Sequence, residues 1–201
     1  MPDRDPKDLT TREDLVTTII NAILELIGEI PESTQKAVPD PSVRCRELIT
    51  TAALKAAAIS GALALPPGPL GLVTVLPDLF AIWRLQAHLV SDIAAAYGKT
   101  AYLTRETMLY CLFRHAAAQT LRDIVIRVGE RVLVRRTSLR AMQKLLQNIG
   151  VKITQRLLGR GVSRFIPIVG AVGVAAYAFY DTRQVGKAAV YLFSQQIENE
   201  G

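Results

Sequence analysis

The sequence predicts an all-α protein, a single compact helical bundle with two apolar helical hairpins and an outer Arg-rich helical segment. Apolar residues recur with the 3.6-residue period of a helix, whereas strand-like alternation is scarce. Half of the 201 residues are hydrophobic and only 6% are aromatic, so Ala, Leu, Val and Ile supply the core. This length suits one domain, which we place at residues 9–197, after a flexible N-terminus at residues 1–8.

The first half of the chain predicts three helices whose ends carry recognisable signals. A capping box that starts at Thr10 opens the first helix, over 10–28, and a glycine and a proline end it. An Asp-Pro pair opens the second helix, over 41–63, which is rich in alanine. A turn with three prolines separates it from the third helix, over 77–97, where Gly98 is a suitable C′ residue.

The second half is predicted to be helical as well. Thr104 suits the N-cap of a fourth helix. Residues 116–161 are predicted to be helical and basic, with breaks near Thr137 and Gly150. A final helical hairpin or one long helix covers 167–196. We expect the two apolar hairpins, around the 66–71 turn and over 167–196, to pack together, with the Arg-rich helices outside them.

Two stretches without charge bear on membrane insertion. Residues 56–77 and 165–180 are uncharged, and a spanning helix needs about 20 mostly apolar residues. Prolines interrupt the first stretch, and the second is short and holds a proline and two glycines. We therefore expect a buried hairpin, or a surface that dips into the interface, and not a span. The acidic N-terminus lacks a secretory signal pattern, and the chain has only two cysteines, which together predict a cytoplasmic location.

The sequence contains no familiar catalytic or metal-binding motif. Phosphate-binding, dinucleotide-binding, metalloprotease and serine-hydrolase patterns are all missing. Cys45 and Cys111 are too few for a disulfide framework or a tetrahedral cysteine site, and His88 and His115 are too few for a histidine-rich site. His88 has an arginine and an aspartate at i±4, which indicates a solvated polar stripe rather than a charge relay. We expect no catalytic residues, no metal and no cofactor.

Charge is distributed unevenly along the chain. Residues 1–47 hold ten acidic and six basic residues, a net charge of −4, whereas residues 114–164 hold twelve basic and two acidic residues, a net charge of +10. Spacing by four places side chains on one face of a helix. Three such rows are predicted to face an anionic surface: Arg127, Arg131 and Arg135; Arg136, Arg140 and Lys144; and Lys152, Arg156, Arg160 and Arg164.

These rows suit a basic amphipathic helix on an anionic membrane. The alternative without a partner is a solvated outer face whose positive charge offsets the acidic first helix. Nucleic acid is disfavoured as a partner, because the basic segment has almost no interleaved aromatic residues and no nucleic-acid-binding signature. The sequence does not indicate an oligomeric state.

Asp78 is the only charged residue between Lys55 and Arg84. A carboxylate in such apolar surroundings is costly without a partner. It is either a first-turn carboxylate that interacts with a helix dipole, or a ligand for a cation or a polar head group.

The segment 65–98 runs from a Pro/Gly turn through Pro77, Asp78 and Gln86 to Tyr97 and Gly98. This order resembles the EcsC family, and residues 165–173, followed by Asp181, are similar to the second block of that family. The turn prolines 66–67 depart from the pattern, as does Asp181, where the pattern leads us to expect asparagine. The resemblance implies an all-helical bacterial protein of a family named after a protein encoded beside an ABC transporter. It implies no catalytic residues, because the family has no established activity.

We therefore expect a non-enzymatic accessory protein that associates peripherally with the anionic inner membrane surface through its basic helical face. One alternative is an interaction subunit that docks an acidic protein partner, such as a transporter component. A second is an enzyme, or a binder of a cation or small ligand, centred on Asp78.

Overall fold

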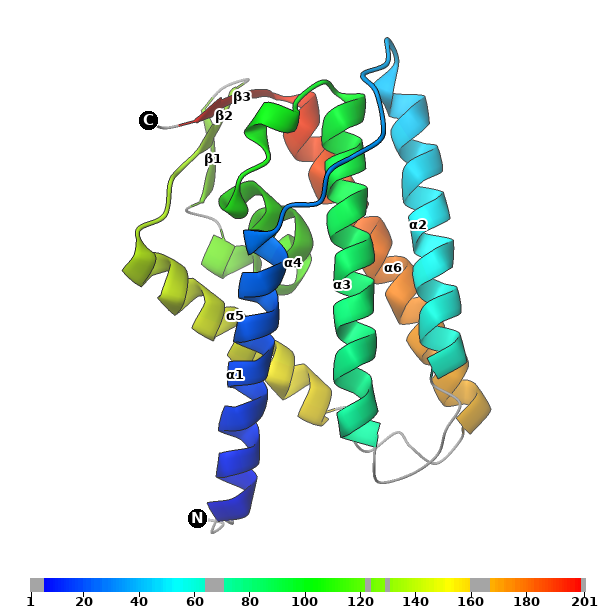
Figure 1. Cartoon of the computed structure of the whole chain (residues 1–201), viewed down its shortest axis with the longest axis vertical. Coiled ribbons are helices and arrows are strands. Elements are labelled where there is room, and N and C mark those ends of the chain that lie inside the picture. The colour runs from blue at the N-terminus through cyan, green and yellow to red at the C-terminus, as the bar shows by residue number, and fades with distance from the viewer. Residues whose placement is uncertain (1–5, 64–70, 122–123, 129–130, 160–166, 200–201) are drawn as a thin grey trace.

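The computed structural model describes residues 6–63, 71–121, 124–128, 131–159 and 167–199, and helices dominate these ranges (Figure 1). Three long helices pack side by side, and three further helices and a small sheet lie against them. The elements in chain order are α1 (Pro6–Gly28), α2 (Pro41–Leu63), α3 (Gly71–Ala96), the short 3-10 helix η1 (Thr100–Tyr102), α4 (Arg105–Leu121), β1 (Val125–Val128), β2 (Arg131–Val134), α5 (Leu139–Gly159), α6 (Pro167–Ser194) and β3 (Gln196–Asn199).

Helices α2, α3 and α6 form the apolar layer that the sequence predicts. Of the two forms expected for residues 167–196, the structure has the single long helix. Small residues allow α2 and α6 to approach closely, since a Cβ atom on Gly186 would overlap the Ile49 side chain. At the other end of the pair, a Cβ atom on Gly61 would lie 3.6 Å from the Ala175 Cβ. The two helices therefore run antiparallel in close contact.

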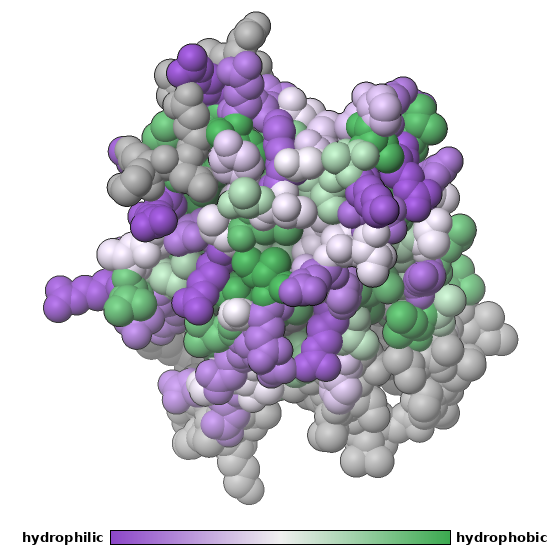
Figure 2. All heavy atoms as spheres, turned by 45° about the horizontal axis from the view of Figure 1, so that its top comes forward, coloured by the Kyte–Doolittle hydropathy of each residue, from purple (hydrophilic) through white to green (hydrophobic). Residues whose placement is uncertain are grey.

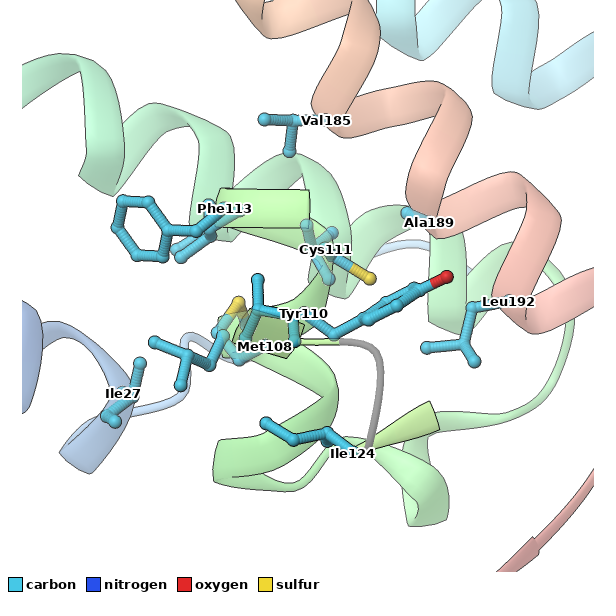
Figure 3. Packing of buried hydrophobic residues seen from close by; sticks show 14 of the residues in the cluster. Ile27, Met108, Tyr110, Cys111, Phe113, Ile124, Val185, Ala189 and Leu192 are labelled. Atoms are coloured by element: carbon cyan, nitrogen blue, oxygen red, sulfur yellow. The ribbon is translucent and has the colours of Figure 1, made fainter. Parts of the chain in front are cut away.

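Helix α4 lies at the centre of the core. Every residue from 107 to 113 is buried, although the sequence of this helix has little amphipathic pattern. Figure 3 shows Met108, Tyr110 and Phe113 surrounded by side chains of α1, α6 and the segment before β1. Because α4 contacts partners on several sides, its apolar residues are not confined to one stripe.

Local end signals are confirmed at two helices. Gly98 has φ +66°, the left-handed conformation expected of the C′ residue after α3. At the start of α4, the Thr107 backbone N–H donates to Thr104 Oγ1 at 3.3 Å, and the Thr104 N–H donates to Thr107 Oγ1 at 2.8 Å. These two reciprocal bonds satisfy donors that a helix end would otherwise leave without partners.

The prediction of helical structure over residues 116–161 is wrong at 125–134. There, β1 and β2 form an antiparallel hairpin, with Val125 opposite Val134 and Val128 opposite Arg131. The third strand, β3, pairs parallel to β2. Val132 and Val134 alternate with more exposed residues and point into the core, which is the two-residue period of a half-buried strand. The sequence signal was a run of β-branched residues on both sides of Gly-Glu.

Three predicted helix boundaries also differ from the structure. Helix α1 begins at Pro6, so Thr10 lies inside it and the predicted capping box does not open it. Helix α3 begins at Gly71, so Pro77 lies inside it rather than at its start. Helix α5 begins after the predicted break near Thr137 but continues through Gly150. The reason is packing, because Gly150 is buried against α1, where a Cβ atom would lie 3.1 Å from Ile20 Cγ1. The predicted N-terminal tail, residues 1–8, falls largely outside the described residues.

Candidate functional site

A carboxylate buried among three helices organises a polar network. Asp181 of α6 is 9% exposed. Its Oδ2 accepts a hydrogen bond of 2.8 Å from Gln86 Nε2 of α3, and its Oδ1 lies 2.6 Å from His115 Nε2 of α4. Gln86 Nε2 also donates to Thr182 Oγ1 at 3.1 Å, and the Tyr177 hydroxyl donates to the carboxylate. We call these five residues the Asp181 network.

Two opposing effects determine the pKa of Asp181. Burial raises the pKa, but the hydrogen bond and charge of His115, together with hydrogen bonds from Gln86 and Tyr177, outweigh it. The net result is a pKa below the usual 3.8. Asp181 is therefore an ionised carboxylate whose donors come from three separate helices, and it fixes α3, α4 and α6 relative to one another.

The Asp181 network suits a structural role better than catalysis. Both carboxylate oxygens of Asp181 accept hydrogen bonds, and the side chains of Gln86 and Thr182 are buried. Only His115, with a side chain 23% exposed, and Tyr177, at 39%, reach solvent. In the described ranges, no group of three or more His, Cys, Asp or Glu side chains is arranged to hold a metal ion.

The structure brings together only some of the residues that the sequence singled out. Gln86 and Asp181 meet directly, 95 positions apart in the chain. Asp78 precedes Gln86 by two turns of α3, roughly 12 Å along the axis, and its side chain lies outside the described part of the structure. His115 had no predicted role, and nothing in the sequence around it indicates its contact with α6.

The last residues of the family motif lie at the end of α3, away from the Asp181 network. Tyr97 and Gly98 end α3, and the next residue, Lys99, reaches the C-terminal end of α6. Its Nζ donates to the carbonyl oxygens of Phe193 at 2.8 Å and Gln195 at 2.5 Å. A cation at a helix C-terminus satisfies carbonyl groups that lack partners within the helix. Burial lowers the pKa of Lys99.

The residues around His88 make separate contacts. Arg84 forms an exposed ion pair with Glu25 at 2.7 Å, while Asp92 accepts a hydrogen bond from Ser33 at 2.5 Å. His88 itself is exposed. These contacts fit the predicted polar stripe and not a charge relay.

A cavity of about 290 Å³ lies between α1 and α3, beside Arg84. No member of the Asp181 network lines it. The two thiols offer no alternative site, because both are buried. Burial raises the pKa of Cys45 to about 11 and that of Cys111 further still, so neither is an activated nucleophile.

The basic residues do not form three helical rows. Arg127 and Arg131 lie on β1 and β2, and Arg135 follows the hairpin, so the first row is wrong as a helix face. In the third row, Lys152 and Arg156 lie on α5, whereas Arg160 and Arg164 fall outside the described residues. Lys152 is half-buried, and Lys152, Arg131 and Arg135 all have interaction partners.

The second predicted row, Arg136, Arg140 and Lys144, is exposed to solvent. Arg136 lies just before α5, and Arg140 and Lys144 lie four residues apart on its first turns. All three are exposed, and within the described part of the chain none forms an ion pair. We call Arg136, Arg140 and Lys144 the basic surface.

The length and hydropathy of the apolar helices bear on membrane insertion. Among the helical residues that the structure describes, no helix combines the length and the hydropathy needed to cross a bilayer.

Comparison with known proteins gives one result at the level of the family. The model of the EcsC protein family matches residues 12–196. No curated protein and no solved structure matches the chain. Because the match covers nearly the whole sequence, the chain belongs to the EcsC protein family.

Proposed function

We propose that this EcsC family member is an accessory protein that associates peripherally with the anionic inner surface of a bacterial membrane. The basic surface of Arg136, Arg140 and Lys144 supplies the electrostatic attraction. The observation that carries the proposal is that these three cations are exposed and form no ion pair in the described part of the structure.

The surrounding sequence supports the same partner. Residues 131–180 contain nine basic residues and no acidic ones. Acidic side chains that would neutralise the basic surface must therefore come from other parts of the chain. One does approach, because Glu106 accepts a hydrogen bond of 3.1 Å from the Thr137 backbone N–H at the start of α5. This carboxylate offsets part of the local positive charge and leaves an excess of cations.

The position of the basic surface on its helix also favours an anionic partner. The N-terminal end of a helix carries a partial positive charge, so a cation there costs about 0.3–1 kcal/mol. Helix α5 has no acidic residue in its first turn, and Arg140 is its second residue. An anionic membrane would convert this unfavourable arrangement into an attractive one, at about 1 kcal/mol for each basic residue near the surface.

Vesicle co-sedimentation tests the proposal. The purified chain is expected to bind vesicles containing anionic lipid and not neutral vesicles, and high salt is expected to release it because exposed charges are screened. The triple variant R136Q/R140Q/K144Q loses about 3 kcal/mol of attraction, which is about a 100-fold weaker partition.

The triple variant R12Q/K36Q/R46Q is the matched control, because it removes the same charge from α1, the following loop and α2. If both triple variants bind equally well, the basic surface is not the contact. If the unmodified chain binds neutral and anionic vesicles alike, or neither, the proposal is wrong. The latter result would favour an acidic protein as the partner of this surface.

A further inference from the structure

The exposed face of α6 changes character along the helix. Val172, Val174 and Tyr180 are 66%, 48% and 60% exposed, which is unusual for such large apolar or aromatic side chains. Further along the helix, on the face that carries Val172 and Tyr180, lie the exposed side chains of Arg183 and Lys187. The face is therefore apolar toward the N-terminal end of α6 and basic beyond Tyr180.

The neighbouring helices change from uncharged to charged at the same height. Gly61 lies against Ala175, and Gly186 lies against Ile49. Because α2 and α6 are antiparallel, residues that lie side by side on them have numbers that add up to about 235. This register places Lys55 of α2 beside Tyr180. On α3, the hydrogen bond from Gln86 to Asp181 places Arg84 close to the same height. In each helix, the basic residue closest to the end formed by Leu63, Gly71 and Pro167 lies near this level: Lys55 on α2, Arg84 on α3 and Arg183 on α6. Arg84 is the member of this set that is ion-paired, with Glu25.

Below that level the three helices are almost free of charge. The segments 56–63, 71–83 and 167–180 contain one charged residue, Asp78. These helix ends lie together at the lower end of the molecule in Figure 1. Figure 2 turns the opposite, upper end of the molecule toward the viewer, and that face carries many hydrophilic side chains among the hydrophobic ones. We call the exposed side chains Val172, Val174, Tyr177 and Tyr180 the apolar end.

The Asp181 network fixes how one of these side chains meets solvent. The Tyr177 hydroxyl donates to the buried carboxylate of Asp181. Tyr177 as a whole is 39% exposed. The Asp181 network therefore holds a tyrosine at the surface of the molecule.

We infer that the apolar end inserts shallowly into the boundary between the head groups and the acyl chains of an anionic bilayer. The inference rests on the proposed function and names the part of the chain that enters the membrane. Apolar side chains below a ring of basic residues match the two layers of such a boundary, and Tyr180 lies where tyrosine is favoured.

The charges favour a bilayer over a second copy of the chain. A second copy of the chain would bring the same basic residues, Lys55 and Arg183, and would give them no opposite charge to meet. An anionic head-group layer attracts the same residues. The bilayer is therefore the occupant that satisfies both the apolar end and the charges around it.

A fluorescent probe on an introduced cysteine tests insertion. In Val172→Cys, labelled with an environment-sensitive dye, binding to anionic vesicles is expected to shift the emission to the blue, and a quencher on the lipid acyl chain is expected to reduce it. Val43→Cys is the matched control, because Val43 is 48% exposed on α2 but lies near its opposite end. The native thiols are buried and are not expected to take up the dye.

A charge at the same position gives an independent measurement. Val172→Asp is expected to weaken partition of the chain into anionic vesicles at low salt by about tenfold, because it removes a large apolar side chain from the contact. Val43→Asp adds the same negative charge near the opposite end of α2 and is expected to leave that partition unchanged.

The possible results separate this inference from the proposed function. If the chain binds anionic vesicles but neither probe shifts, insertion is wrong and surface attachment stands. If it binds no vesicles, both fail. If Val172→Cys forms a disulfide between two copies in solution without lipid, the apolar end is an interface between copies and the inference is overturned.

Discussion

Replacement of Asp181 tests whether its network holds the helices together. Asp181→Ala removes a buried acceptor that serves α3, α4 and α6 at once. The Asp181→Asn variant keeps the shape of the side chain but removes its charge. Comparison of the two variants separates the contribution of charge from that of packing and hydrogen bonding.

The geometry gives the expected size of the effect. Gln86, 1% exposed, loses its 2.8 Å acceptor but keeps Thr182. His115 loses its 2.6 Å partner, but its side chain is 23% exposed and water can replace part of that bond. A hydrogen bond to a charged group contributes about 1.5–3 kcal/mol. Because solvent recovers some of this, Asp181→Ala is expected to lower the free energy of unfolding by roughly 3 kcal/mol.

Urea unfolding, followed by circular dichroism, measures this change. The pKa of Asp181 is lower in the folded chain than the usual 3.8, so its ionised form stabilises the fold above that pH. The stabilisation is lost as the pH falls through the folded-state pKa. The unmodified chain and Asp181→Asn are therefore expected to differ most in free energy of unfolding near neutral pH. This difference is expected to become smaller below pH 3.8.

Two results would refute this reasoning. A cost below about 1 kcal/mol for Asp181→Ala would mean that the network contributes no more than an ordinary surface contact. A difference between the unmodified chain and Asp181→Asn that does not change with pH would mean that the charge of Asp181 is not what stabilises the fold.

Further predictions concern packing, capping and thiol reactivity. Gly186→Ala is expected to cost about 1–3 kcal/mol in urea unfolding, because the added Cβ overlaps a side chain of α2; Gly173→Ala on the same helix meets no atom within 4 Å and should be neutral or stabilising, so equal effects would contradict the packing argument. Lys99→Met removes two hydrogen bonds to the end of α6 and is expected to speed amide hydrogen exchange in β3; unchanged exchange would show that the cap is dispensable. Cys45 and Cys111 are buried with raised pKa values, and both are expected to react with a thiol reagent only as fast as the chain unfolds; rapid reaction in the folded state would disprove their burial.

Arginine spacing illustrates where sequence reasoning failed. Arg127, Arg131 and Arg135 are spaced by four, which places side chains together only where one helix carries all of them. Here Arg127 and Arg131 lie on different strands of a hairpin and Arg135 follows it, and the spacing alone does not reveal the turn between them. The β-branched residues around a Gly-Glu pair were the better signal, and they correspond to the hairpin of β1 and β2.

Local signals by themselves determined much of the helical framework. Thr104 caps α4 and Gly98 ends α3 because the interactions that define those ends lie within a few residues. The family motif likewise identified Gln86 from the sequence. The partners of Gln86 and His115 were decided only by the tertiary structure, since α6 brings Asp181 to both across large separations in the chain. Exposure of the basic surface and of the apolar end was decided in the same way, because a periodic pattern states which residues share a face and only packing states which faces remain uncovered.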